Sequence, residues 1–255
     1  MNKFLAPVFV AAALSLTANN VLADEPVRET RSVTANVTKV KLGGVVDLVL
    51  RQGATPSLVV SGDREFVSLV TTEQRGNTLE IGTRPHDRRS INRERKVRAE
   101  LTVPNLQDFV SHGVGSSTLT GFTGDSLQLA LDGAGAVNVN SRYRHVDARL
   151  GGAGSLTLDA NQAEEVELNL RGAGRMTATG QSKLLRARLS GVGSLDAQGL
   201  RADTVELDLT GLGSASVYAK DSAKVNLSGM GSATVYGNPA NRNANANGMG
   251  KVSWK

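Results

Sequence analysis

The sequence predicts an all-β protein, a parallel β-helix (β-solenoid) whose coils each take about 19–20 residues. Three observations support this fold class. A Gly-x-Gly element recurs at a nearly constant interval, apolar and polar residues alternate on both sides of each copy, and no segment has a convincing helical period. Alternation with a period of two is the pattern of a strand with one buried face, so each coil should be built from strands.

The Gly-x-Gly element occurs eight times, and consecutive copies are 18 to 20 residues apart. Their first glycines are Gly113, Gly133, Gly152, Gly172, Gly191, Gly211, Gly229 and Gly248. Corners of a solenoid favour glycine because φ is positive there or because two backbones approach closely. The middle residue is apolar in every copy, and we expect it to point into the bend and stack on its equivalents in adjacent coils. These residues are Val114, Ala134, Ala153, Ala173, Val192, Leu212, Met230 and Met249.

Each Gly-x-Gly lies between two alternating segments. Val146, Ala148 and Leu150 precede the third copy, and Leu156 and Leu158 follow it, each separated by one residue. We therefore expect two strands per coil, stacked about 4.8 Å from the equivalent strands of the next coil. Charged residues at equivalent outward positions should then stack in register, the last four with alternating sign. They are Asp147, Glu167, Arg186, Glu206 and Lys224.

We divide the chain into a signal peptide, residues 1–23, and a single solenoid domain, residues 24–255. Within that domain, residues 28–110 show interrupted alternation and are predicted as irregular N-terminal coils, and residues 111–255 contain the regular Gly-x-Gly repeats. Trp254 is the only tryptophan and takes an inward position in the last coil. We expect it to plug the open end of the core, with ligand stacking as the alternative.

The first 23 residues have the features of a secretory signal. Lys3 precedes an apolar run over residues 4–18, and Val21-Leu22-Ala23 is a small-residue cleavage pattern. A transmembrane anchor is the alternative, but the run is shorter than the roughly 20 residues that a span needs. We expect an exported protein, periplasmic or at the cell surface, with no transmembrane span.

The composition and motifs exclude several kinds of catalytic and ligand-binding site. The 255 residues include no Cys, which excludes disulfides, thiolate catalysis and Cys-based metal sites. Gly-x-Gly followed by a strand is not a nucleotide-binding loop, because that loop opens a helix. Ser stands where a calcium-binding β-roll needs Asp, and the three histidines show no ligand spacing. We therefore predict no cofactor and no metal.

The formal net charge of +5 is concentrated in one segment, residues 84–98, where seven basic residues oppose Asp87 and Glu94. Such a cluster is a candidate site for anionic groups of a glycan or lipopolysaccharide, and the alternative is a solvated loop between two strands. Nucleic acid is not expected as a partner, because no aromatic residues are interleaved and no recognition module is present. The candidate residues are Arg84, Arg88, Arg89, Arg93, Arg95, Lys96 and Arg98.

Tyr218 and Tyr236 are 18 residues apart at equivalent outward positions of adjacent coils. Aromatic side chains on a polar sheet can stack on sugar rings, so this pair is a candidate glycan site. The alternative is ordinary strand propensity.

The chain resembles the head GIN domain family, the putative auto-transporter adhesins. The resemblance rests on the strand pair over residues 37–50, the segments 77–81 and 101–106, the tandem Leu-x-Gly-x-Gly-Ser units such as residues 227–232, and the closing segment 235–239. It implies a right-handed β-helix and a role in surface adhesion, and it brings no catalytic or binding residues. Many members look lipid-anchored, but this chain lacks the Cys for such an anchor.

Three functions remain open at this point. The first is a secreted, non-enzymatic binding protein for a surface glycan, an envelope component or an envelope protein. The second is a polysaccharide-degrading β-helix enzyme, for which Glu167 and Glu206 would be the acids to test, although outward acids beside arginines also serve as a solubilising ladder. The third is a purely structural envelope protein. We favour the first.

Overall fold

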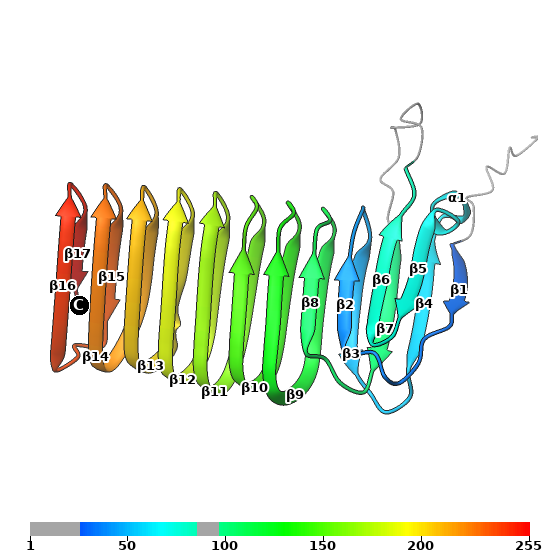
Figure 1. The fold of residues 1–255 in the computed structure, drawn as a ribbon, viewed down its shortest axis with the longest axis horizontal. Coiled ribbons are helices and arrows are strands. Elements are labelled where there is room, and N and C mark those ends of the chain that lie inside the picture. The colour runs from blue at the N-terminus through cyan, green and yellow to red at the C-terminus, as the bar shows by residue number, and fades with distance from the viewer. Residues whose placement is uncertain (1–25, 86–96) are drawn as a thin grey trace, which may run out of the picture.

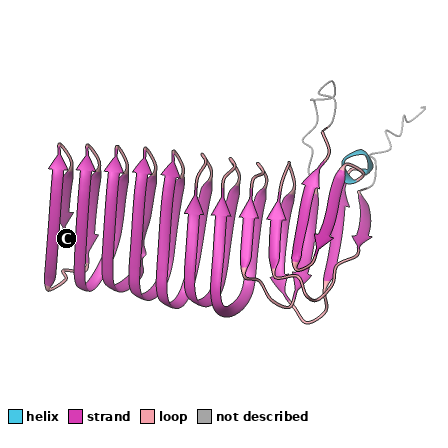
Figure 2. Ribbon diagram, viewed as in Figure 1, coloured by secondary structure: helices cyan, strands magenta, loops and turns pink. Residues whose placement is uncertain are grey.

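The computed structural model describes residues 26–85 and 97–255, and the predicted signal peptide lies outside this range. The described chain forms a β-solenoid of about eight turns (Figure 1), which confirms the predicted fold class. Its only helix is α1 (Arg64–Val67), at the N-terminal end (Figure 2). No helix in the described part is long and apolar enough to cross a membrane.

The repeats form six long strands and a short C-terminal coil. The six long strands are β9 (Ser116–Leu131), β10 (Ala136–Leu150), β11 (Ser155–Gly172), β12 (Arg175–Gly191), β13 (Ser194–Gly211) and β14 (Ser214–Gly229). The short C-terminal coil consists of β15 (Ser232–Tyr236), β16 (Asn241–Gly248) and β17 (Lys251–Trp254). Each long strand runs along one face of a flattened coil, bends, and returns along the other face (Figure 1). The two strands expected in each coil are thus two halves of one continuous strand.

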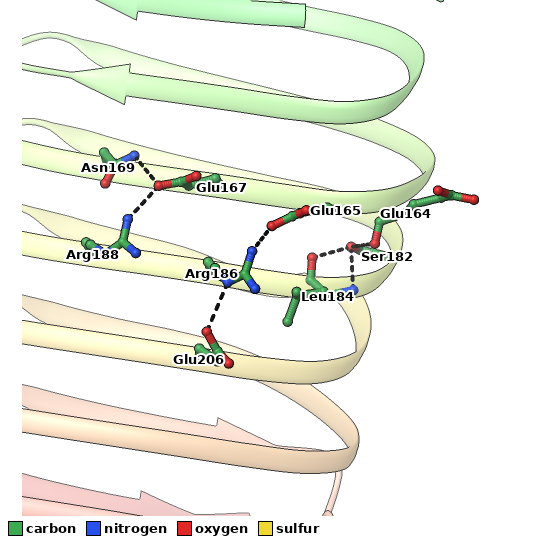
Figure 3. A network of polar contacts seen from close by, with 9 residues as sticks. All are labelled: Glu164, Glu165, Glu167, Asn169, Ser182, Leu184, Arg186, Arg188 and Glu206. Atoms are coloured by element: carbon green, nitrogen blue, oxygen red, sulfur yellow. Dashed lines mark hydrogen bonds and ion pairs between the residues drawn. The ribbon is translucent and has the colours of Figure 1, made fainter. Parts of the chain in front are cut away.

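The flattened solenoid has two edges. The Gly-x-Gly segments lie along one, at the top in Figure 1, which we call the turn edge. The bends inside β9–β14 lie along the other, which we call the rounded edge. Glu164 of β11 and Ser182 of β12 lie at this edge (Figure 3). The register between neighbouring long strands shifts at or near this rounded edge, for example between Asp159 and Gln162 of β11.

Neighbouring coils are parallel and in register. Asp147 aligns with Glu167, Glu167 with Arg186, Arg186 with Glu206 and Glu206 with Lys224, as the sequence predicts. The alternate positions point inward and form continuous apolar rows through the core, because side chains of a strand alternate between its faces. One such row consists of Val146, Val166, Leu185, Val205 and Ala223, all buried.

The N-terminal part continues the same sheet with irregular connections. It contains β1 (Val27–Arg31), β2 (Lys39–Leu42), β3 (Asp47–Gln52), β4 (Ser57–Gly62), β5 (Val70–Arg75), β6 (Thr78–Thr83), β7 (Arg98–Val103) and β8 (Asp108–Ser111). β2 lies between β6 and β8, and β3 lies between β7 and β9, all parallel. Three further pairs, β1–β4, β4–β7 and β5–β6, are antiparallel. The coil order in space therefore differs from the chain order.

The middle residues of the Gly-x-Gly elements do not point into the bend, so this prediction is wrong. Val192, Leu212 and Met230, for example, are more than half exposed. The reason is the close packing beneath each turn. A Cβ atom on Gly193 would lie 2.4 Å from a methyl carbon of Leu170 and 2.7 Å from the carbonyl oxygen of Gly174, so the inside of the turn is already filled.

The last coil has the predicted register. Val252 and Trp254 align with Ala233 and Val235, and both are partly buried against the core. The guanidinium carbon of Arg242 lies 5.5 Å from the centre of the Trp254 ring, which covers part of the indole.

Candidate functional site

The basic segment lies mostly outside the described residues. Arg88, Arg89, Arg93, Arg95 and Lys96 are not described, whereas the flanking Arg84 and Arg98 are described and exposed. Arg98 Nε lies 3.2 Å from Glu100 Oε1.

The described ends of this segment lie at the turn edge. Strand β6 ends at Thr83, whose side chain lies directly against Gly44 in the turn between β2 and β3. Strand β7 begins at Arg98, beside Asp47 at the start of β3. The described residues on either side of 86–96 therefore lie where other coils have their tight turn.

Tyr218 and Tyr236 are paired in register on adjacent coils, as the sequence predicts. Arg201 is aligned with Tyr218 one coil earlier, and its guanidinium carbon lies 5.0 Å from the Tyr218 ring centre. The Lys255 ammonium lies 5.7 Å from the Tyr236 ring centre. The four side chains form one row in which both aromatic rings carry a cation on one face.

Tyr218 also lines a groove of about 690 Å³ along the rounded edge. The groove crosses five coils, β10 to β14, and most of its lining residues are polar or charged. Its lining includes the amides of Gln162 and Gln181 and the charged side chains of Arg144, Glu164, Lys183, Arg201, Asp203 and Lys220. Tyr236 does not line this groove. The two tyrosines, which are equivalent in the sequence repeat, therefore differ in their surroundings.

The charges of the groove alternate in sign from coil to coil. Arg144 lies 3.3 Å from both Asp125 and Glu164, Lys183 lies 3.3 Å from Glu164, and Lys220 lies 3.7 Å from Asp203. The pKa of the Glu164 carboxyl lies below its usual value. The main cause is the pair of hydrogen bonds that Lys183 and Arg144 donate to it. The groove thus presents fixed charges of both signs at regular intervals.

Sequence reasoning missed this groove, although the sequence contains a signal for it. Asp125, Arg144, Glu164, Lys183 and Asp203 are 19, 20, 19 and 20 residues apart, which is the repeat interval, and they alternate in sign. The Gly-x-Gly spacing alone could not show it, because those residues mark the opposite edge.

Figure 3 shows the charged residues on the face formed by the second halves of β11–β13. Arg186 bridges two coils: its side chain pairs with Glu165 on one side and lies 3.0 Å from Glu206 on the other. Arg188 Nη1 lies 2.6 Å from Glu167 Oε1. Of the residues predicted to stack, Arg186 and Glu206 form an in-register ion pair. On the other side the contacts are diagonal: Arg186 pairs with Glu165, and Glu167 pairs with Arg188.

These pairs bear on the enzyme alternative. Glu167 and Glu206, its candidate acids, are each bound by an arginine, and Glu167 also accepts a hydrogen bond of 3.2 Å from Asn169. A general acid or base needs a carboxyl group that is free to exchange a proton with a substrate. In the described residues, no group of three or more His, Cys, Asp or Glu side chains could hold a metal ion.

A second, shallower groove of about 640 Å³ runs along the turn edge. Its lining is dominated by the Gly-x-Gly segments, and the apolar residues along it are Val114, Ala134, Ala153, Ala173 and Val192. This groove lines the turn edge and the larger one lines the rounded edge. Figure 1 shows that these two edges lie opposite each other.

Comparison with known protein families shows to which family the chain belongs. Residues 36–239 match the model of the family described as "Putative auto-transporter adhesin, head GIN domain". The chain belongs to this family. The match spans the N-terminal coils and seven of the eight Gly-x-Gly elements, so the GIN domain includes both the irregular and the regular part of the solenoid. No curated protein matches the chain.

Solved structures share the GIN fold at low sequence identity. A protein of Parabacteroides distasonis described as a putative adhesin is 21% identical, with a TM-score of 0.83, and the match covers 91% of this chain and 98% of that one. A second from the same species, described as a putative lipid binding protein, is 19% identical, with a TM-score of 0.80 and coverage of 90% and 96%. A putative adhesin of Parabacteroides merdae is 17% identical, with a TM-score of 0.81 and coverage of 90% and 96%. At these identities the likeness is one of fold.

Proposed function

We propose that this GIN-domain protein is an exported, non-enzymatic adhesin that binds a surface glycan in the groove of the rounded edge. One observation carries the proposal: the groove places Tyr218, two amides and alternating charges on five consecutive coils. An aromatic ring packs on the apolar face of a sugar, and amides and charged groups bond its hydroxyls and carboxylates. A repeating ligand suits a site whose side chains also repeat.

The charge of the groove favours an acidic glycan. Its lining contains four cations, Arg144, Lys183, Arg201 and Lys220, and two anions, Glu164 and Asp203. Arg201 stacks on Tyr218, so its guanidinium is held beside the ring that would contact a sugar. A uronate carboxylate next to that sugar ring would meet a positioned cation.

A glycan array followed by calorimetric titration of the best ligand tests this function. Tyr218→Ala should weaken binding of an acidic oligosaccharide by about tenfold. Tyr236→Ala is the matched control, because it removes the same side chain from the next coil outside the groove. Equal losses for both variants, or no bound glycan on the array, would reject the groove as the site.

The basic segment is a separate proposed site for anionic groups, and its described ends lie at the opposite edge. Charge reversal of Arg88, Arg89, Arg93 and Arg95 in one variant should abolish binding of a sulfated or phosphorylated glycan if this segment binds it. Unchanged binding would remove the segment from the proposal. Release of products from acidic polysaccharides, lost on mutation of Glu167 or Glu206, would instead support the enzyme alternative.

A further inference from the structure

The exposed middle residues of the turns form one continuous row. In consecutive turns the amide N–H of the middle residue donates a hydrogen bond to the carbonyl oxygen of a glycine in the preceding turn. The pairs, all at 3.0 or 3.1 Å, are Val114 to Gly44, Val192 to Gly172, Leu212 to Gly191 and Met230 to Gly211. Because Val114 bonds to Gly44, the row begins one coil earlier than the Gly-x-Gly repeats, at Val45. We call this set the apolar row: Val45, Val114, Ala134, Ala153, Ala173, Val192, Leu212, Met230 and Met249.

The apolar row is exposed along its whole length. The six large side chains in it are between 54% and 81% exposed, and the three alanines are exposed as well. Nine positions separated by about 4.8 Å give a straight line of about 38 Å, one side chain wide. Soluble proteins scatter their exposed apolar residues, so nine in one line indicate a surface that is covered in use.

Cations flank the apolar row. Arg171 and Arg175 lie on either side of Ala173, and Lys251 follows Met249 closely; all three are exposed. Arg84 lies at the N-terminal end of the same edge, as does Arg98, whose charge is paired with that of Glu100 at 3.2 Å. Acidic residues at this edge offset these cations only in part: Asp47 is only partly exposed, and the exposed Asp132 lies 3.7 Å from His112. The edge therefore combines an apolar line with an excess of positive charge.

The width of the row decides what kind of partner fits. A stable protein interface needs about 800 Å² on each side, with a broad apolar centre. A line one side chain wide offers roughly half of that area, even at a width of about 10 Å. A bilayer surface has no such requirement, since exposed apolar side chains with cations beside them can lie among the head groups as the apolar face of an interfacial amphipathic helix does.

We propose that the turn edge docks on the surface of an anionic lipid bilayer, with the apolar row inserted among the head groups. The largest side chains, Leu212, Met230 and Met249, make the C-terminal half of the row the stronger contact. In this orientation the rounded edge, opposite the turn edge in Figure 1, points away from the membrane. The proposal does not depend on the glycan function, because the two edges share no residues.

Vesicle co-sedimentation of the full mature chain tests the docking. Vesicles of phosphatidylglycerol mixed with phosphatidylcholine should bind the protein, and vesicles of phosphatidylcholine alone should bind it much less. A variant with Leu212→Ser, Met230→Ser and Met249→Ser should bind about tenfold more weakly. Tyr218→Ala is the control on the other edge and should bind as the unmodified protein does.

A fluorescent label separates insertion from loss of folding. The chain has no Cys, so Leu212→Cys and Gln181→Cys can each carry a single environment-sensitive dye. The dye at 212 should shift to shorter wavelength on mixing with anionic vesicles, whereas the dye at 181, on the rounded edge, should not shift. No vesicle binding, equal shifts at both positions, or full binding by the triple serine variant would each overturn the proposal.

Discussion

The Tyr143 hydroxyl donates a hydrogen bond of 2.5 Å to the carbonyl oxygen of Leu106, and both residues are buried. Tyr143 belongs to β10 at the rounded edge, and Leu106 lies in the connection between β7 and β8. The ring of Tyr143 covers Gly124 of the preceding coil so closely that a Cβ atom there would lie 2.7 Å from a ring carbon. One side chain thus fastens the regular repeats to the irregular N-terminal part, and its burial raises the pKa of the Tyr143 hydroxyl.

Replacing Tyr143 by Phe should destabilise the protein by about 1–2 kcal/mol, because it leaves the buried Leu106 carbonyl without its donor. Denaturant unfolding followed by circular dichroism measures the change. Tyr236→Phe is the matched control, since that tyrosine lies at the surface, and it should change stability very little. Similar values for both variants would mean that the hydroxyl of Tyr143 contributes nothing specific.

Gly231→Ala should destabilise the solenoid by about 1–3 kcal/mol. The added Cβ atom would lie 2.2 Å from a methyl carbon of Leu209 and 2.6 Å from the carbonyl oxygen of Gly213, so a core side chain and the backbone of the preceding turn must both shift. Met230→Ala, at the adjacent exposed position, should stay within about 0.5 kcal/mol of the unmodified protein. Thermal melts of the two variants compare them directly, and a Gly231→Ala protein as stable as Met230→Ala contradicts the packing argument.

The repeat register could be predicted from the sequence because two signals agree. The period of two fixes which residues face the core, and the interval of 18 to 20 residues fixes which residues stack, so Glu167, Arg186 and Glu206 are placed correctly. The same signals say nothing about which side of a tight turn faces out. The orientation of Val192 depends on Leu170 and Gly174 of the preceding coil, which fill the inside of the turn.

The N-terminal part and the groove were harder to predict for different reasons. An alternating segment is compatible with either strand direction, so the antiparallel pairing of β4 with β7 leaves no trace in the pattern. The groove could have been found, because Arg144, Glu164 and Lys183 repeat with the coil interval. Its hollow shape depends on how each strand bends, which side-chain type does not determine.

Asp147→Asn should stabilise the protein at neutral pH. Burial is the main cause that raises the pKa of the Asp147 carboxyl, against the opposing effect of Arg149, and the negative charge of Glu167 raises it further. The side chain is 24% exposed, and one of its oxygens is buried without a hydrogen-bond partner. The folded state therefore binds this proton more tightly than the unfolded state does, and stability falls as pH rises from the usual pKa of Asp to the raised value.

The Asp147→Asn variant cannot ionise at this position, so it lacks this fall in stability as pH rises. Its Tm at pH 7 should therefore exceed that of the unmodified protein by about 1–2 °C. The difference should disappear below about pH 3, where the aspartate is protonated in both states. Melting curves across this pH range measure it. A lower Tm for Asp147→Asn at pH 7 would show that the ion pair with Arg149 outweighs the burial of the carboxyl group.

Trp254→Ala should loosen the last coil and leave the others intact. In a solenoid each coil is stabilised mainly by its neighbours, so a defect at one end spreads only as far as the adjacent coils. Trp254 covers the core beside Val235 and carries Arg242 on its ring, and all eight residues of β16 are exposed. Hydrogen exchange should therefore become faster in β15–β17 and stay unchanged in β10–β12. Uniformly faster exchange in every coil would show instead that the tryptophan supports the cooperative unfolding of the whole solenoid.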